Sequence, residues 1–292
     1  MAIWIAVLLG IIQGIFMFLP VSSTAHMVLA EHWLIQNGFT LPDPASPEMI
    51  LFNLVVHVGT LVSIAVVFWS SLSRFVLHSA TGAVSWARRG GRDGLPVSMR
   101  LFALGLFSVL CTGLLGLAFK STFELVFAQP RIIALTLIVT GVLLFCSDRL
   151  GPRRRGLRQT GLGTAAVIGL AQGMALAPGL SRSAMTITAG LFMGLKRRWA
   201  AEYSFFVAIP TILAATLVQS RDVWRAEGLG EISWAALGTG FVVAALVGIV
   251  SLKLVVWTLM KAKLGWFAIY VWALAALILL GVVNLDTVLM TH

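Results

Sequence analysis

Residues 176–190 read Leu-Ala-Pro-Gly-Leu-Ser-Arg-Ser-Ala-Met-Thr-Ile-Thr-Ala-Gly, a short polar stretch inside an otherwise apolar run. Pro178 lacks a backbone donor and Gly179 tolerates turn dihedrals, so one helix is expected to end here, and a following serine can cap the next. The first N–H groups of that next helix are unpaired and its dipole is positive at that end. Arg182 adds a full charge with a fork shaped for phosphate oxygens. The stretch therefore predicts an anion site at membrane depth.

The composition is that of an integral membrane protein. Of the 292 residues, 59% are hydrophobic and 11% are charged, and the mean hydropathy is +0.97. Soluble domains have about a quarter of their residues charged, so an ordinary soluble domain is excluded. The net charge of +10 is explained by loops on one side of a bilayer, and we expect no nucleic-acid partner.

Six apolar stretches are long enough to cross a bilayer, which takes about 20 residues. They lie at about 51–70, 101–119, 131–147, 200–218, 233–252 and 265–285. Two further apolar segments are each broken by a proline and nearby serines, one into 2–19 and 22–35, the other into 162–177 and 182–194. Because these halves are short, we predict an all-α integral membrane protein with six transmembrane helices and two re-entrant helical hairpins.

The two predicted hairpins resemble each other in sequence. Gly-Ile-Ile-Gln-Gly at 10–14 precedes Pro20, and Gly-Leu-Ala-Gln-Gly at 169–173 precedes Pro178. If both hairpins return to the side they entered, most of the Lys and Arg residues share one side, which is then cytoplasmic, and both termini lie outside. The hairpins enter from opposite sides, so we predict an inverted repeat of about 1–150 and 159–292 within one membrane domain, a plan seen in transporters.

Four loops on the predicted cytoplasmic side carry most of this charge. They include Arg74 and Arg88 after the first span, and Lys253 and Lys261 before the last.

The predicted repeat places polar residues of the two hairpins opposite one another. These are Ser22, Ser23 and His26 from the first, and Ser181, Arg182 and Thr186 from the second. Ser22 and His26 are four residues apart, as are Arg182 and Thr186, so each pair is expected to share a helix face. Hydroxyls, an imidazole and a guanidinium suit a phosphate ester or anhydride, where catalysis is largely positioning and charge neutralisation.

Two long motifs carry a family resemblance. They read Gln13-Gly14-x-x-x-Phe18-Leu19-Pro20-x-Ser22-Ser23-x-x-His26 and Pro178-Gly179-x-Ser181-Arg182-Ser183-x-x-Thr186. Together they resemble the bacterial undecaprenyl-diphosphate phosphatase family, BacA or UppP, over nearly the whole chain. The resemblance implies hydrolysis of a C55 polyprenyl diphosphate to undecaprenyl phosphate and inorganic phosphate. It also implies a multi-pass protein of the bacterial cytoplasmic (inner) membrane, with an active site facing the periplasm, that serves peptidoglycan synthesis and confers bacitracin resistance.

The resemblance also implies which residues act. The first motif supplies Gln13, a serine at Ser22 or Ser23, and His26 as general acid or base, and the nucleophile is a serine or an activated water. The second motif supplies the diphosphate-binding residues Gly179, Ser181, Arg182, Ser183 and Thr186.

Residue 17 departs from the family pattern, which has a glutamate where this chain has Met17. The resemblance implies a divalent cation, but Mg²⁺ and Ca²⁺ want oxygen ligands, which leaves Gln13 as the candidate ligand. Three explanations stand: an engineered inactive state, replacement of the carboxylate by another group such as His26, or a branch that binds or flips lipid phosphates without hydrolysing them. The sequence also leaves open a homodimer.

Arg182 and His57 are both polar residues within apolar sequence. Arg182 is functional by default, because an arginine at membrane depth is costly. His57 lies inside a predicted span, where a packed histidine satisfied by a neighbouring helix is favoured over a site residue.

Overall fold

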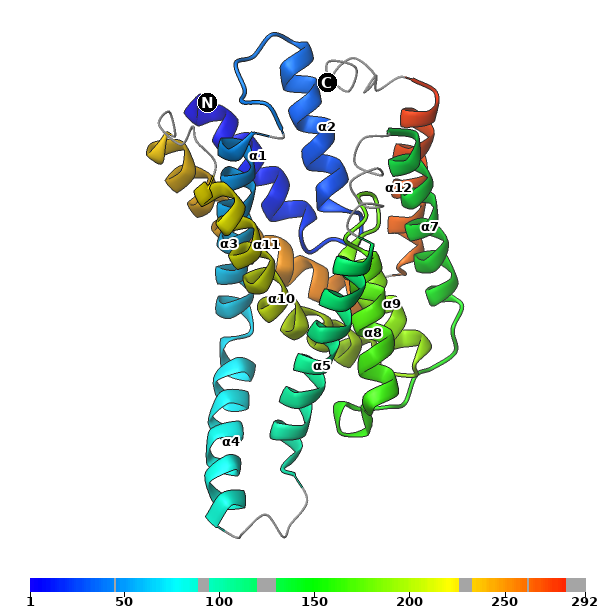
Figure 1. Ribbon diagram of the computed structural model, residues 1–292. Coiled ribbons are helices and arrows are strands. Elements are labelled where there is room, and N and C mark those ends of the chain that lie inside the picture. Colours follow the sequence, from blue (N-terminus) through cyan, green and yellow to red (C-terminus); the bar gives the residue numbers. More distant parts are fainter. Residues whose placement is uncertain (45, 89–94, 120–129, 226–232, 262, 282–292) are drawn as a thin grey trace.

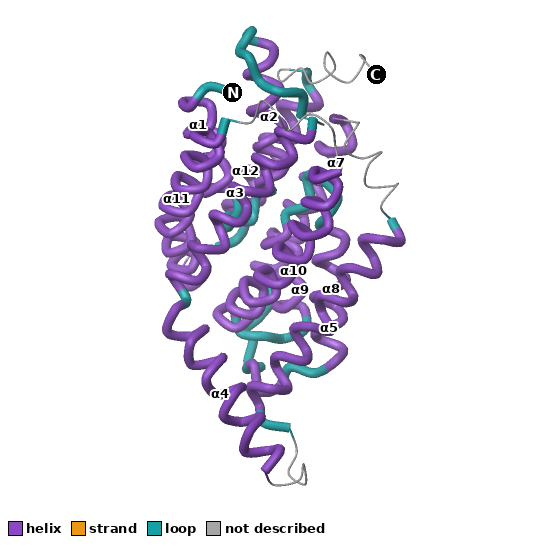
Figure 2. The backbone as a smooth tube through the Cα atoms, turned by 60° about the vertical axis from the view of Figure 1, so that its left-hand side comes forward, coloured by secondary structure: helices purple, strands orange, loops and turns teal. Residues whose placement is uncertain are grey.

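A computed structural model describes residues 1–44, 46–88, 95–119, 130–225, 233–261 and 263–281. The described chain is almost entirely helical and contains no strand beyond one isolated bridge (Figure 2). The helices, in order, are α1 (Ile3–Phe16), α2 (Ser23–Gln36), α3 (Pro47–Val67), α4 (Trp69–Arg88), α5 (Val97–Ala118), α7 (Pro130–Asp148), α8 (Leu162–Met174), α9 (Arg182–Phe192), α10 (Arg197–Arg225), α11 (Trp234–Lys261) and α12 (Gly265–Leu279), with a 3₁₀ turn at Leu157–Gln159. The predicted all-α class is confirmed.

Five helices are long and apolar enough to cross a membrane, namely α3, α5, α7, α10 and α11. Each corresponds to one of the predicted spans, and α10 and α11 are longer than predicted. Of the sixth predicted span, 265–285, the first 15 residues form α12, and residues 282–285 lie outside the described part of the chain. The chain is therefore a multi-pass membrane protein.

The two predicted hairpins form as pairs of short helices. The 14 residues of α1 make a helix of about 21 Å, well below the about 30 Å of a bilayer core. The chain turns between α1 and α2 and again between α8 and α9, and the helices of each pair contact each other. In Figure 1 the α1–α2 pair lies in the upper part of the molecule, above α8 and α9.

Glycines let the short helices approach their neighbours closely. A Cβ atom on Gly14 of α1 would lie 2.9 Å from the Val247 Cβ atom of α11, and one on Gly173 of α8 would lie 3.0 Å from the Leu115 Cβ atom of α5. Both glycines therefore lie where two helices pack closely. A buried cluster that includes Met17, Phe18, Leu61, Ile64 and Phe205 then joins the turn of the first hairpin to α3 and α10.

The prediction of a basic loop after the first span is wrong for residues 69–88. They form α4, which carries Arg74 and Arg88 and projects downward in Figure 1. No residue of α4 is buried, and its polar residues make it less hydrophobic than the five spans. Hydropathy alone therefore does not predict this helix. The predicted loop before the last span is also partly helical, because Lys253 and Lys261 belong to α11.

Candidate functional site

The turns of the two hairpins meet inside the helix bundle. The Ser183 Oγ atom, in the first turn of α9, donates a hydrogen bond to the Leu19 carbonyl oxygen at 3.2 Å. The Arg182 Nη2 atom lies 4.0 Å from the Met17 Sδ atom. The fold thus brings together the two motifs that the sequence separates by about 160 residues.

The turn before α9 is held by two threonines of α7. Gly179 has a φ of +88°, and a side chain there would overlap Thr136, whose hydroxyl donates to the Pro178 carbonyl at 2.6 Å. Thr140 donates to the Gly179 carbonyl at 3.0 Å and accepts from the Ser181 amide at 3.2 Å. Only a glycine fits at position 179, and its positive φ turns the backbone into the start of α9.

Side chains of the second motif fix the start of α9. A serine caps α9, as predicted, and it is Ser181, whose Oγ atom accepts from the Ala184 amide at 3.3 Å. The fully buried Thr186 donates to the Arg182 carbonyl at 2.8 Å and also hydrogen-bonds the Ser204 hydroxyl of α10. Its hydroxyl therefore joins α9 to α10. Among these side chains, Arg182 reaches toward the first hairpin.

Ser22 caps α2 from a strained backbone. Its φ of +70° is the only positive value at a non-glycine position among the described residues, and its Oγ atom accepts from the Ala25 amide at 3.4 Å. Such a conformation costs on the order of 1–3 kcal/mol and is typical of functional sites. Ser23, which follows, is half-buried, and its hydroxyl lies 4.0 Å from the Met17 Sδ atom.

Both ring nitrogens of His26 are engaged. Its Nδ1–H group donates to the Ser22 carbonyl at 2.7 Å, so Nε2 accepts from the Tyr270 hydroxyl of α12, also at 2.7 Å. The ring stacks on Phe16, with centroids 3.8 Å apart, and on Tyr270 at 5.7 Å. His26 is thus fixed in one tautomer and one orientation.

Met17 is the point on which donors from both hairpins converge. Its Sδ atom lies 3.4 Å from Gln13 Nε2, 4.0 Å from Ser23 Oγ and 4.0 Å from Arg182 Nη2, and the residue is 5% exposed. A thioether is a weak acceptor. Within the described chain, the buried Arg182 Nη1 and Gln13 Oε1 atoms have no hydrogen-bond partner. The site therefore surrounds Met17 with hydrogen-bond donors and a positive charge, although its thioether is a weak acceptor and carries no negative charge.

The donor set around Met17 does not fit Mg²⁺ or Ca²⁺. Its oxygen atoms are Gln13 Oε1 and Ser23 Oγ, both neutral, and the Arg182 guanidinium lies beside them. These cations prefer several oxygen ligands that include carboxylates. The described residues contain no group of three or more His, Cys, Asp or Glu side chains that could hold a metal ion.

Further polar residues, which were not among the predicted site residues, hydrogen-bond one another between the helices. Glu31 of α2 is 3% exposed and accepts from Asn53 Nδ2 at 3.3 Å, and the Asn53 carbonyl accepts from His57 Nδ1 at 2.7 Å. Gln172, the counterpart of Gln13 in the repeated Gln-Gly pair, is buried and donates to Thr211 at 2.7 Å. Glu31 could have been singled out from the sequence, because a carboxylate within an apolar half-helix is rare.

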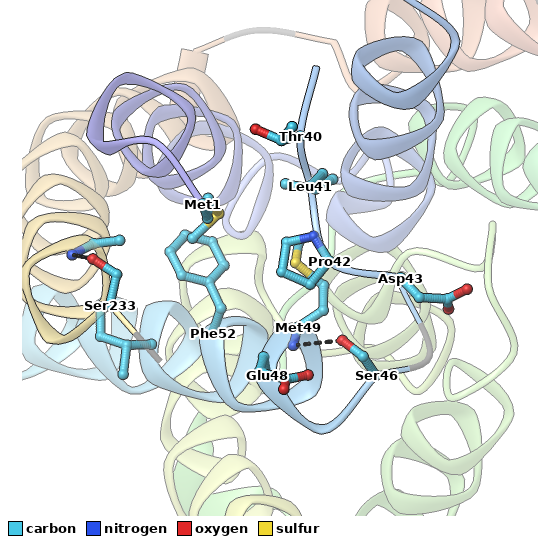
Figure 3. A pocket seen from close by; sticks show the side chains of 12 residues that line it. Met1, Thr40, Leu41, Pro42, Asp43, Ser46, Glu48, Met49, Phe52 and Ser233 are labelled. Atoms are coloured by element: carbon cyan, nitrogen blue, oxygen red, sulfur yellow. Dashed lines mark hydrogen bonds between the residues drawn. The ribbon is translucent and has the colours of Figure 1, made fainter. Parts of the chain in front are cut away.

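Two cavities lie away from Arg182. The first, of about 470 Å³, is shown in Figure 3, where Asp43 and Glu48 are among its lining residues and no lysine or arginine is. Carboxylates would repel a diphosphate. The second, of about 690 Å³, is lined mainly by apolar side chains of α4, α5 and α10. Neither lining suits an anion, in contrast to the meeting point of the two turns, where Arg182 lies.

Comparisons with known proteins agree with the motifs. A family model described as bacitracin resistance protein BacA matches residues 6–277. The chain is 67% identical over 285 residues to the undecaprenyl-diphosphatase of Alkalilimnicola ehrlichii, covering 98% of each chain. It is 68% identical over 285 residues to that of Halorhodospira halophila, covering 98% of this chain and 99% of the relative. The undecaprenyl-diphosphatase of Carboxydothermus hydrogenoformans is 34% identical over 94% of this chain and 95% of its own length.

Proposed function

The chain belongs to the bacitracin resistance protein BacA family, and from that premise we propose that it hydrolyses undecaprenyl diphosphate to undecaprenyl phosphate and inorganic phosphate. One observation carries the proposal: the Arg182 guanidinium, at the N-terminus of α9, faces the polar turn of the first hairpin at 4.0 Å from Met17. The helices of the bundle are apolar, which suits a substrate that carries a lipid tail. The product is the carrier lipid of peptidoglycan synthesis, and its release is the basis of bacitracin resistance.

Arg182 binds the terminal phosphate group. Its Nη1 atom is buried without a partner in the described chain, and an uncompensated buried charge costs about 3–5 kcal/mol. Phosphate oxygens would satisfy this atom, and the first amides of α9 would add donors with the favourable end of the helix dipole. Ser181, Ser183 and Thr186 are hydrogen-bonded within the protein, so their role is to position Arg182.

Ser23 is the hydroxyl of the first hairpin that serves the reacting phosphate. The Ser22 oxygen caps α2, whereas Ser23 is half-buried and lies beside Met17 and therefore near Arg182. We assign Ser23 to hold the attacking water. His26, whose Nε2 atom accepts from Tyr270, then orients the start of α2 through its bond to the Ser22 carbonyl.

Met17 lowers the rate of this chain. A general base typically contributes about 10²–10⁴-fold, and methionine cannot act as one. The divalent cation implied by the family would also lack a carboxylate ligand here. The proposed hydrolysis therefore rests on the protein's own side chains.

The proposed orientation puts the active site toward the periplasm of a bacterial inner membrane. The beginning of α1 and the end of α12 lie at one end of the molecule, and α4, with Arg74 and Arg88, projects from the other (Figure 1). Basic residues favour the cytoplasmic side. This distribution supports termini outside.

We also propose the inverted repeat of about 1–150 and 159–292. The short helices exchange partners between halves: α1 packs on α11, and its counterpart α8 packs on α5. Likewise α3 contacts α11, and α10 contacts α5. Because this plan occurs in transporters, movement of a lipid phosphate between leaflets is the second candidate function.

Phosphate release from undecaprenyl diphosphate in detergent tests the proposal. We expect this chain to release phosphate and Arg182→Gln to lose at least about 10²-fold in kcat/KM. Arg88→Gln, a change at an exposed arginine of α4, is the matched control and keeps the parent rate.

Hydrolysis is refuted if both this chain and its Met17→Glu variant bind the lipid without releasing phosphate. In that case the protein is next tested in vesicles for transfer of a lipid phosphate between leaflets.

A further inference from the structure

A row of polar side chains leads from α2 through α3 toward Arg182. Asn53 donates to the buried Glu31 carboxylate at 3.3 Å, and its backbone carbonyl accepts from the His57 Nδ1–H group at 2.7 Å. Asn53 and His57 are four residues apart, so they share one face of α3. No part of the family motifs includes these three residues.

The same face of α3 is packed against the first hairpin turn. Leu61 and Ile64 follow His57 by four and seven residues, and both belong to the buried cluster that contains Met17 and Phe18. At that turn the Arg182 Nη2 atom lies 4.0 Å from the Met17 Sδ atom. His57 therefore lies beside the meeting point of the two turns.

The hydrogen bond to Asn53 fixes the proton of His57. A backbone carbonyl only accepts, so Nδ1 carries the hydrogen and Nε2 holds a lone pair. Within the described residues, Nε2 of His57 makes no hydrogen bond, whereas both nitrogens of His26 are bonded. Of these two histidines, His57 is the one with a free basic nitrogen.

Resting on the hydrolysis proposed above, we propose that His57 is the general base of this chain and that Asn53 and Glu31 position it. The Nε2 atom accepts a proton from the attacking water as the water oxygen bonds to the terminal phosphorus. The bond from that phosphorus to the bridging oxygen breaks, and its electron pair leaves with undecaprenyl phosphate. His57 then returns the proton to inorganic phosphate.

Two ionisable groups lie toward His57 from other helices. Arg182 of α9 belongs to the meeting point of the two turns, and Glu31 of α2 is joined to His57 through hydrogen bonds of Asn53. α1 has no ionisable side chain. Among the described side chains of the other helices packed on α3, Glu202 of α10 is paired with Arg198, Arg197 is paired with Asp148, and Arg221 of α10 and Lys253 of α11 are exposed. α4 runs on from the far end of α3. The rate of the parent is thus expected to fall in acid, as His57 takes up a proton.

The test compares His57→Gln in two backgrounds, this chain and Met17→Glu, by phosphate release from undecaprenyl diphosphate across about pH 5–8. In this chain we expect kcat to fall at least about 10²-fold, KM to change little, and the acidic fall of the pH profile to disappear. In Met17→Glu, which has a carboxylate base, the same substitution costs less than about tenfold. His78→Gln, at an exposed histidine of α4, is the matched control.

Two results overturn the role of His57 while leaving the proposed function intact. One is an equal loss in both backgrounds, which marks a structural role. The other is a silent parent whose Met17→Glu variant turns over, because His57 then supplies no base. Failure of hydrolysis itself is recognised separately, by silence of both parents.

Discussion

Met17→Glu is the substitution whose effect follows most directly from the geometry of the site. The glutamate Cδ atom occupies the place of the Met17 Sδ atom, and a carboxylate oxygen extends about 1.2 Å beyond it. Arg182 Nη2 is 4.0 Å from Sδ, so an oxygen aimed at it would lie at about 2.8 Å, the length of a charge-assisted hydrogen bond. Gln13 and Ser23 are placed to donate to the same group.

The expected effect is a faster reaction. A carboxylate here supplies a base and an oxygen ligand for a cation, and a general base contributes about 10²–10⁴-fold. Because His57 already provides part of that function, we expect kcat to rise by about 10², near the lower limit. We also expect the rate of Met17→Glu, but not of this chain, to fall when a chelator removes Mg²⁺ and Ca²⁺.

The assay is phosphate release from undecaprenyl diphosphate in detergent, with added Mg²⁺ or Ca²⁺ and then with chelator. Met17→Gln is the matched control, since glutamine has the shape of glutamate and accepts hydrogen bonds but carries no charge. The reasoning is refuted if Met17→Glu is no faster than Met17→Gln, or if this chain already hydrolyses as fast as Met17→Glu.

Two further outcomes follow from the turns and from α12. Gly179→Ala destabilises the fold by about 2–4 kcal/mol in thermal unfolding, because φ is +88° and the new methyl overlaps Thr136, whereas Gly38→Ala, at φ +77° with open space around it, costs about 1 kcal/mol. Tyr270→Phe removes the donor to His26 Nε2 and lowers kcat by about fivefold with unchanged unfolding temperature; a loss of 10² or more would give His26 a direct part in proton transfer.

The sequence predicted the features that local chemistry controls. Pro178 and Gly179 end one helix, Ser181 caps the next, and Arg182 is too costly among apolar residues to be incidental. These rules act over a few residues, and the structure confirms the break and the cap. The apolar spans were likewise found, because their hydropathy is a property of composition.

Side-chain direction could not be predicted in the same way. The hydroxyl of Thr186 hydrogen-bonds Ser204 of α10, and the partner of His26 is Tyr270, 244 residues along the chain. Both contacts depend on how whole helices pack. α4 was missed for a different reason: the spans were predicted from hydropathy, and α4 is amphipathic, with enough polar residues to fall below the hydropathy of a membrane span.

The two hairpins divide the proposed chemistry. The charge that holds the anion belongs to the second turn, which α7 fixes through Thr136 and Thr140. The groups that handle protons belong to the first turn and to α3. Residue 17 lies at the boundary between them, buried among Gln13, Ser23 and Arg182. The absence of a carboxylate there weakens proton transfer but leaves the α7-held turn in place, so its consequence falls on kcat far more than on substrate affinity.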